Sequence, residues 1–267
     1  MKAGVSSASL YPMHTEDAVR TLCELGVKHT EIFVNDISET RGAVFDEIKS
    51  IARSFELDVV SVHPFSTPME TLFMFSDYDR RRETFFDMYR SYFDFAERMG
   101  ARIFVLHGAA KEARCSDSMY FEQFLRLCDI ASEYGLTVAQ ENISYCRSAD
   151  IDFLKRMMKE CGDRAKFVLD IKQAVRSGIS PFELLYVLGR SMIHVHISDN
   201  MPGKDCLPPG KGSFDLSGLI KKLSEIKFDG AVLTELYRSN YGEPSELYDS
   251  MVYIENIIQN VEKCDVK

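Results

Sequence analysis

The most constraining feature of this sequence is the alternation of short apolar runs with longer amphipathic segments along the whole chain. Apolar and β-branched residues predict eight strands, each followed by a helical pattern. The predicted strands cover residues 3–9, 29–35, 58–63, 102–107, 137–142, 166–170, 193–198 and 231–235. Strictly alternating strand–helix units form a parallel sheet with helices packed against it, so the fold class is α/β.

Eight such units within 267 residues, without a linker between them, predict one domain spanning residues 1–267. This number of units is typical of a closed (β/α)₈ TIM barrel. The rival is an open doubly wound sheet, which usually carries a glycine-rich phosphate loop after its first strand. The corresponding segment here, residues 9–14, contains no glycine. The closed barrel is therefore favoured, and we expect no organic cofactor.

Composition and charge exclude several classes of protein. With 45% hydrophobic and 27% charged residues, the chain has the composition of an ordinary globular protein. A net charge of −9 argues against broad binding to nucleic acid or to a membrane surface. The seven cysteines are scattered, without a CxxC pair, which is typical of free thiols in a reducing compartment. No signal peptide or bilayer-spanning segment is recognisable, so we expect a cytoplasmic protein.

Local signals predict how some helices begin and what one of them contacts. Thr15 is expected to cap the first helix, Ser148 or Asp150 the fifth, and Asp215 the seventh. The long helix near 79–99 carries an aromatic-rich segment at residues 84–93. This segment is expected either to face the barrel or to form the interface of a homo-oligomer.

Polar side chains stand where six successive predicted strands end. In a barrel these carboxyl ends share one face, where active sites are built. The set contains four of the six histidines and three acids: His63, His107, Glu141, Asp170, His194, His196 and Glu235. The remaining histidines, His14 and His29, lie outside this pattern and are expected at the surface.

Carboxylates gathered in a barrel mouth repel one another and are costly to desolvate unless a cation offsets their charge. The pattern therefore predicts one divalent metal ion held by Glu141, Asp170, His196 and Glu235. Three oxygens and one imidazole nitrogen suit Mn²⁺, Mg²⁺, Co²⁺ or Zn²⁺. A single histidine or acid at a strand end is more often a hydrogen-bonded or ion-paired structural residue, and this is our interpretation of His194.

These residues carry a resemblance to a known family. The chain resembles the xylose isomerase-like TIM-barrel superfamily, which includes sugar phosphate isomerases/epimerases, ketose 3-epimerases and AP endonuclease family 2. The matching motifs stand at the strand ends in order: His63, His107-Gly108, Glu141-Asn142, Asp170, His196–Asp199, Pro209–Gly212 and Glu235. The resemblance implies that Glu141, Asp170, His196 and Glu235 bind one divalent metal. It also implies that the two glutamates move protons on opposite faces of a bound sugar.

Two departures from the family pattern affect the interpretation. The family often has Asp-x-x-His after the sixth strand, and here Gln173 replaces that histidine. Residues 199–215 contain no histidine, whereas the endonuclease branch has an Asp-x-His pair after the seventh strand as part of a three-zinc cluster. A phosphodiesterase or nuclease is therefore a weak alternative, as is a non-catalytic binding barrel. Lys172 is unusual at its position, and it is expected either to contact substrate or to face outward at a helix start.

The resulting hypothesis is a metal-dependent isomerase or epimerase acting on a sugar or sugar phosphate. A bound metal would polarise a ketose carbonyl and favour an enediolate, with Glu141 and Glu235 as the catalytic proton-transfer residues. A dehydratase of a keto-polyol, of the inosose or dehydroshikimate type, is the alternative on the same site.

Further side chains are expected to contact the carbohydrate substrate or to support the ligands. The candidate substrate-binding residues are Phe33, His63, Phe65, His107, Lys172, Gln173, Asp199 and Arg238. The aromatic rings would pack on apolar sugar faces and the histidines would bind hydroxyls. Arg238 would orient Glu235 or bind a charged substituent, and Asp199 would fix the surroundings of His196.

Overall fold

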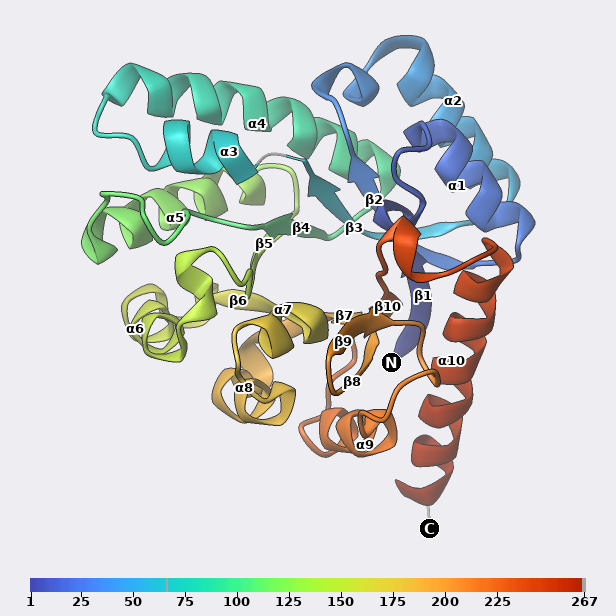
Figure 1. The fold of residues 1–267 in the computed structure, drawn as a ribbon. Coiled ribbons are helices and arrows are strands. Elements are labelled where there is room, and N and C mark those ends of the chain that lie inside the picture. The colour runs from blue at the N-terminus through green and yellow to red at the C-terminus, as the bar shows by residue number, and fades with distance from the viewer. Residues whose placement is uncertain (66, 266–267) are drawn as a thin grey trace.

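The computed structural model describes residues 1–65 and 67–265, and it confirms the closed parallel barrel (Figure 1). Within the described residues, eight parallel strands run around the barrel in the order β1-β10-β7-β6-β5-β4-β3-β2. They are β1 Lys2–Ser6, β2 His29–Val34, β3 Asp58–Pro64, β4 Ile103–Leu106, β5 Thr137–Glu141, β6 Lys166–Asp170, β7 Met192–Ile197 and β10 Ala231–Thr234. β1 pairs with both β10 and β2, which closes the sheet and excludes the open doubly wound alternative.

Helices surround the strands, and α10 packs beside β1 where the ring closes (Figure 1). The helices are α1 Thr15–Glu24, α2 Gly42–Ser54, α3 Thr67–Met69, α4 Asp79–Met99, α5 Asp117–Ser132, α6 Ile151–Cys161, α7 Ile171–Arg176, α8 Pro181–Leu188, α9 Leu216–Glu225 and α10 Ser245–Asp265. A hairpin of β8 Asp199–Met201 and β9 Lys204–Leu207 extends from the loop after β7. The main apolar core lies between the strands and these helices.

The first strand differs most from its sequence prediction. It was expected over residues 3–9, but it ends at Ser6, and residues 7–10 form a short 3₁₀ helix. The Ser6 hydroxyl accepts the backbone N–H of Ala8 and so caps this turn. Local side-chain capping therefore ends a segment whose composition alone predicts a longer strand.

Two of the expected helix caps are confirmed and one is wrong. Asp150 caps α6 through the N–H of Asp152, and Asp215 caps α9 through the N–H of Gly218. Thr15 instead is the first residue of α1 and donates its hydroxyl hydrogen to Glu39, 2.8 Å away.

The aromatic segment of α4 faces the barrel. Phe85, Phe86, Tyr89, Tyr92 and Phe93 are each at most 4% exposed. Their burial explains the aromatic pattern without a second chain, and homo-oligomerisation stays a prediction. Within residues 1–65 and 67–265, no helix combines the length and the apolarity needed to cross a bilayer.

Candidate active site and metal centre

Four side chains from four neighbouring strands converge at the carboxyl end of the barrel. Glu141 ends β5, Asp170 ends β6, His196 lies near the end of β7, and Glu235 directly follows β10. The Nδ1 atom of His196 lies 3.2 Å from Glu141 Oε1, 3.1 Å from Glu235 Oε2 and 3.7 Å from Asp170 Oδ2. All four residues are buried. The parallel register, in which Asp170 pairs with His196, brings these side chains to one level.

This arrangement fits a divalent cation. One imidazole N–H cannot donate to three carboxylates at once, so hydrogen bonding alone does not explain three oxygens around one nitrogen. The donor atoms of Glu141, Asp170, His196 and Glu235 all lie within 4.8 Å of one another. Three carboxylate oxygens and one imidazole nitrogen form a donor set suited to Mg²⁺, Mn²⁺ or Zn²⁺. The structure therefore contains a candidate metal-binding group at the predicted place.

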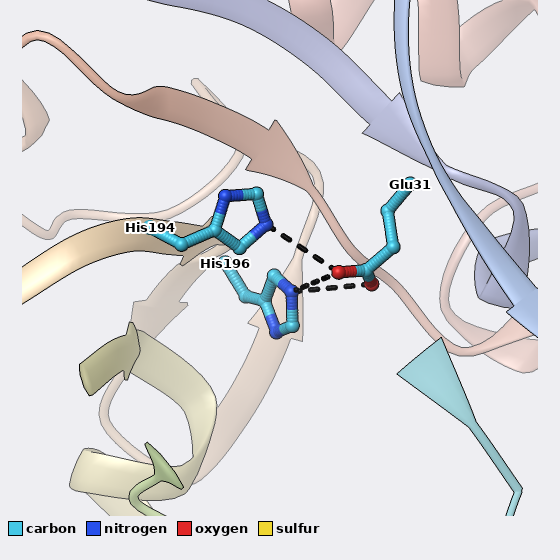
Figure 2. Close-up of side chains that lie close together, drawn as sticks. All are labelled: Glu31, His194 and His196. Carbon is cyan, nitrogen blue, oxygen red and sulfur yellow. Dashed lines mark hydrogen bonds and ion pairs between the residues drawn. The ribbon is translucent and has the colours of Figure 1, made fainter. Parts of the chain in front are cut away.

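Glu31 is a member of the site that the sequence analysis missed. It lies on β2, is fully buried, and accepts hydrogen bonds from the hydroxyls of Ser6 and Ser61 at 3.0 and 2.8 Å. Its carboxylate also lies 3.2 Å from His196 Nε2 and 3.4 Å from His194 Nε2, and Figure 2 shows both imidazoles turned toward it. A metal-ligating histidine commonly donates its other N–H to a carboxylate in this way. The available signal was a single acid in the middle of a predicted strand, directly before the apolar residues 32–34.

The electrostatics of the site keep most of its carboxylates ionised. Burial alone would raise the pKa of Glu31, but the facing His196 and His194 imidazoles outweigh burial and hold that pKa well below its usual range. The same competition, with His107 and His196 as partners, lowers the pKa of Glu141. Burial would also raise the pKa of Glu235, but Lys172 and His196 together outweigh burial and lower that pKa.

Burial and neighbouring charges shift the pKa values of Asp170 and of the two histidines of β7 in different directions. Burial raises the pKa of Asp170, because it exceeds the opposing effect of the Lys172 ammonium. For His196, burial opposes the charged form, but the carboxylates of Glu31 and Glu235 outweigh it and raise the pKa well above its usual value. Burial dominates at His194 and lowers its pKa. His194 also contacts the Ser61 hydroxyl at 3.3 Å, as expected for a hydrogen-bonded structural residue.

His63 and His107 form a pair beside Glu141. Their Nε2 atoms are 2.7 Å apart, and His107 Nε2 lies 3.0 Å from Glu141 Oε2. Burial would lower the pKa of His107, but the Glu141 carboxylate outweighs it and raises that pKa. Both histidines line the cavity above the four converging residues. The structure thus brings both of these predicted substrate-binding histidines to the cavity.

A cavity of about 230 Å³ opens over these groups. Its polar floor includes Glu141 and Glu235, and Phe33 packs edge-on against His63 with ring centres 4.9 Å apart. Four exposed aromatic rings line its outer part: Tyr11, Phe65, Tyr145 and Tyr237. Phe33 and Phe65 were expected here, but the three tyrosines were not. Aromatic faces of this kind bind the apolar faces of sugar rings through dispersion and burial.

Lys172 and Gln173 both line the cavity. The outward-facing alternative for Lys172 is wrong, because the side chain is 4% exposed and its ammonium contacts the carboxylates of Asp170 and Glu235. Gln173 donates its backbone N–H to Asp170 Oδ1 and accepts the backbone N–H of Ser144 with its side chain. Gln173 thus helps to fix the loop after β5 against the start of α7.

Two expected substrate contacts are not brought to the cavity. Arg238 is exposed and donates to the backbone carbonyl of Tyr241 at 3.1 Å, so it neither orients Glu235 nor points inward. Asp199 is buried, and its carboxylate accepts backbone N–H groups of Gly210, Gly212 and Phe214. Its role in the structure is to hold the loop after β7, because these N–H groups have no strand partner there.

The fold and this cluster together define a parallel α/β barrel with a buried acid–histidine site at its carboxyl end. The chain matches the family model described as xylose isomerase-like TIM barrel over residues 19–257, and it belongs to that family. A curated relative, an uncharacterised protein of Mycobacterium leprae, is 25% identical over 273 residues, covering 92% of each chain.

Solved structures share the same architecture. One described as a D-tagatose 3-epimerase-like protein has a TM-score of 0.81 and 21% identity, covering 98% of this chain and 99% of that one. The 3-keto-D-glucoside 4-epimerase of E. coli has a TM-score of 0.75 and 17% identity, covering 96% of this chain and 99% of that one. At these identities the similarity shows the fold.

Proposed function

We propose that this protein is a divalent-metal-dependent isomerase or epimerase of a ketose or keto-sugar. The observation that supports this most directly is the pair of ionised glutamates that flank His196. Glu141 and Glu235 come from β5 and from the end of β10, and both line the cavity. Carboxylates placed on two sides of one bound molecule are suited to remove a proton from one face and to return one to the other.

The metal-binding part of the proposal rests on the donor set described above. A divalent ion held by Glu141, Asp170, His196 and Glu235 would supply Lewis-acid polarisation of the substrate carbonyl. Glu31 fixes the orientation of His196 from the opposite side of the imidazole, through the 3.2 Å contact to Nε2. The chain therefore provides both the donors and a support for the one nitrogen donor.

The proton-transfer steps use groups of the chain itself. We propose that Glu141 removes the proton from the carbon beside the carbonyl, since its ionised form is held by His107 and His196. Glu235, after taking up a proton from solvent, delivers it to the other face, which inverts the carbon, or to the neighbouring carbon, which isomerises the sugar. The proton taken by Glu141 then returns to solvent, so both carboxylates are ionised again. His63 and His107 hold substrate hydroxyls, and Phe33 and Phe65 pack against the carbon skeleton.

The substrate class proposed is a small carbohydrate without a phosphate group. Within the described chain, Lys172 is the one lysine or arginine that lines the cavity, and its ammonium is already paired with Asp170 and Glu235. A phosphoryl group is normally bound by arginine, lysine or a helix N-terminus directed at it. Two similar structures are described as a D-tagatose 3-epimerase-like protein and a 3-keto-D-glucoside 4-epimerase, and both descriptions refer to sugars without a phosphate group.

The test is solvent exchange at the reacting carbon. The purified protein, loaded in turn with Mn²⁺, Mg²⁺, Co²⁺ or Zn²⁺, is incubated in D₂O with a panel of free ketoses and keto-glucosides. We expect deuterium at the carbon beside the carbonyl, measured by NMR, together with an epimer or isomer of unchanged composition. Products that have lost water, seen by mass spectrometry, would instead identify a keto-polyol dehydratase. No exchange and no product with any metal-loaded form would overturn the proposal.

A further inference from the structure

The ammonium of Lys172 occupies an unusual position inside the candidate metal centre. It contacts Asp170 Oδ2 and Glu235 Oε2. These are the same two oxygen atoms that lie 3.7 and 3.1 Å from His196 Nδ1, within the predicted donor set. A lysine side chain and a divalent ion would therefore use the same two oxygens of the chain.

The local structure explains why the lysine reaches this place. Asp170 is the N-cap of α7, and its Oδ1 atom accepts the backbone N–H of Gln173. The helix thus uses one carboxylate oxygen and leaves Oδ2 facing the barrel mouth. Lys172 is the second residue of α7, so its side chain starts beside the cap and extends to the same oxygen.

The charge of the cluster gives the lysine a function. Four buried carboxylates, those of Glu31, Glu141, Asp170 and Glu235, surround His196, and the last two also contact Lys172. Without a cation, acids this close would repel one another in a low-dielectric interior. The Lys172 ammonium offsets part of that repulsion at the two acids it contacts.

We infer that Lys172 is a built-in counter-ion of this site, and that its ammonium competes with a divalent ion for Asp170 and Glu235. The inference relies on the proposed function only for the identity of the four ligands. A +1 and a +2 charge on the same two oxygens repel each other strongly, so the metal must displace the ammonium. The Tyr237 ring, which lines the same cavity, has its centre 5.9 Å from Lys172 Nζ, so the ammonium stands between the two carboxylates and an aromatic face.

The competition makes the lysine a determinant of metal affinity. Displacing the ammonium costs part of the binding free energy of the metal, so the natural chain binds a divalent ion more weakly than a chain without this charge. The metal-free protein, in contrast, gains stability from Lys172. Metal affinity and metal-free stability should therefore change in opposite directions when the lysine is replaced.

The experiment compares Mn²⁺ binding by isothermal titration calorimetry in the wild type and in Lys172→Met, Lys172→Gln and Lys172→Arg. We expect the two neutral variants to bind Mn²⁺ at least about tenfold more tightly, and the arginine variant, which retains the charge, to stay near the wild type. Lys221→Met removes the same charge from the exposed surface of α9 and should leave Mn²⁺ affinity unchanged. Thermal unfolding without metal should show lower melting temperatures for the neutral Lys172 variants than for the wild type.

The outcomes separate this inference from the proposed function. Equal or weaker Mn²⁺ binding by folded Met and Gln variants, with tight binding by the wild type, overturns the inference and leaves the proposed function standing. Binding by the neutral variants but not by the wild type supports the competition and overturns metal dependence of the natural chain. Absence of binding in every variant overturns both.

Discussion

Both ends of the barrel carry acids and histidines, but these side chains are partly exposed at the amino end and buried at the carboxyl end. At the amino end, Lys2, His29 and Asp58 from β1, β2 and β3 form ion pairs of 2.7 and 2.9 Å, with side chains 31 to 50% exposed. At the carboxyl end, Glu31 and His196 lie 3.2 Å apart with no exposed side-chain surface. His29 and Glu31 are only two residues apart on the same strand, so depth within the barrel makes the difference.

The comparison shows that the buried charges at the carboxyl end, unlike the exposed ion pairs at the amino end, are not explained by folding stability. Exposed ion pairs contribute about 0.2–1 kcal/mol each, and solvent can replace either partner. Buried charges lose hydration that only good partners or a cation restore, so a cluster of four buried carboxylates is costly for folding alone. The amino end thus serves stability, whereas the carboxyl end gathers the buried acids to which the proposed function assigns metal binding and proton transfer.

The largest difference between the two ends should appear on replacing Glu141 with Gln. The shape is retained but the proton acceptor is lost, so we expect turnover to fall by about 10²–10⁴-fold. Deuterium exchange into the substrate, measured with the metal-loaded variant, checks this. Asp58→Asn at the amino end is the matched control and should keep full turnover. If E141Q turns over as fast as the wild type, Glu141 is not the base.

A second contrast concerns the backbone beside the site. Gly108, after β4, has φ +82°, and a Cβ there would lie 2.0 Å from the hydroxyl of the buried Tyr120. Gly108→Ala should lower the free energy of unfolding by about 2–4 kcal/mol through strain and overpacking. Gly135→Ala, at the amino end with φ +70° and open space, should cost only about 1–2 kcal/mol. Urea unfolding of both variants measures this, and equal losses would contradict the steric argument.

Glu31 connects the interior of the barrel to its carboxyl end, and replacing it should act through His196. Glu31→Gln removes the charge that fixes the Nε2–H of His196, so we expect Mn²⁺ affinity to fall by about 10–100-fold. Titration calorimetry measures this change. Glu39→Gln, which also alters a buried acid but one paired with Thr15 outside the cluster, is the control. Unchanged affinity in E31Q would show that His196 needs no support from β2.

The sequence alone predicted the barrel because its evidence is periodic and local. Eight strand patterns in the required order specify a closed parallel sheet, and the residues that follow them must share one end of the barrel. For this reason the convergence of Glu141, Asp170, His196 and Glu235 could be expected without coordinates.

The features that sequence reasoning missed depend on side-chain reach and on contacts between distant strands. Glu31 is 165 residues from His196 in the chain, and only barrel closure makes them neighbours. The direction of Lys172 depends on the cap that Asp170 forms for α7. Arg238 shares the carboxyl end with Glu235, but its contact with the carbonyl of Tyr241 keeps it outside the cavity. The position of a residue at a strand end therefore predicts which end of the barrel it occupies. Its individual side-chain contacts follow only from the packed structure.

The smallest expected effect lies at the amino end and has a distinct pH dependence. Burial would raise the pKa of Asp58, but Lys2 and His29 outweigh it and lower that pKa. A group with a lowered folded-state pKa adds stability above its unfolded pKa, near 3.9, and loses it as pH falls through the folded value. Asp58→Asn should therefore cost about 0.2–1 kcal/mol near neutral pH. In urea unfolding the gap from the wild type should close in acid, and a gap that widens there would contradict the ion-pair explanation.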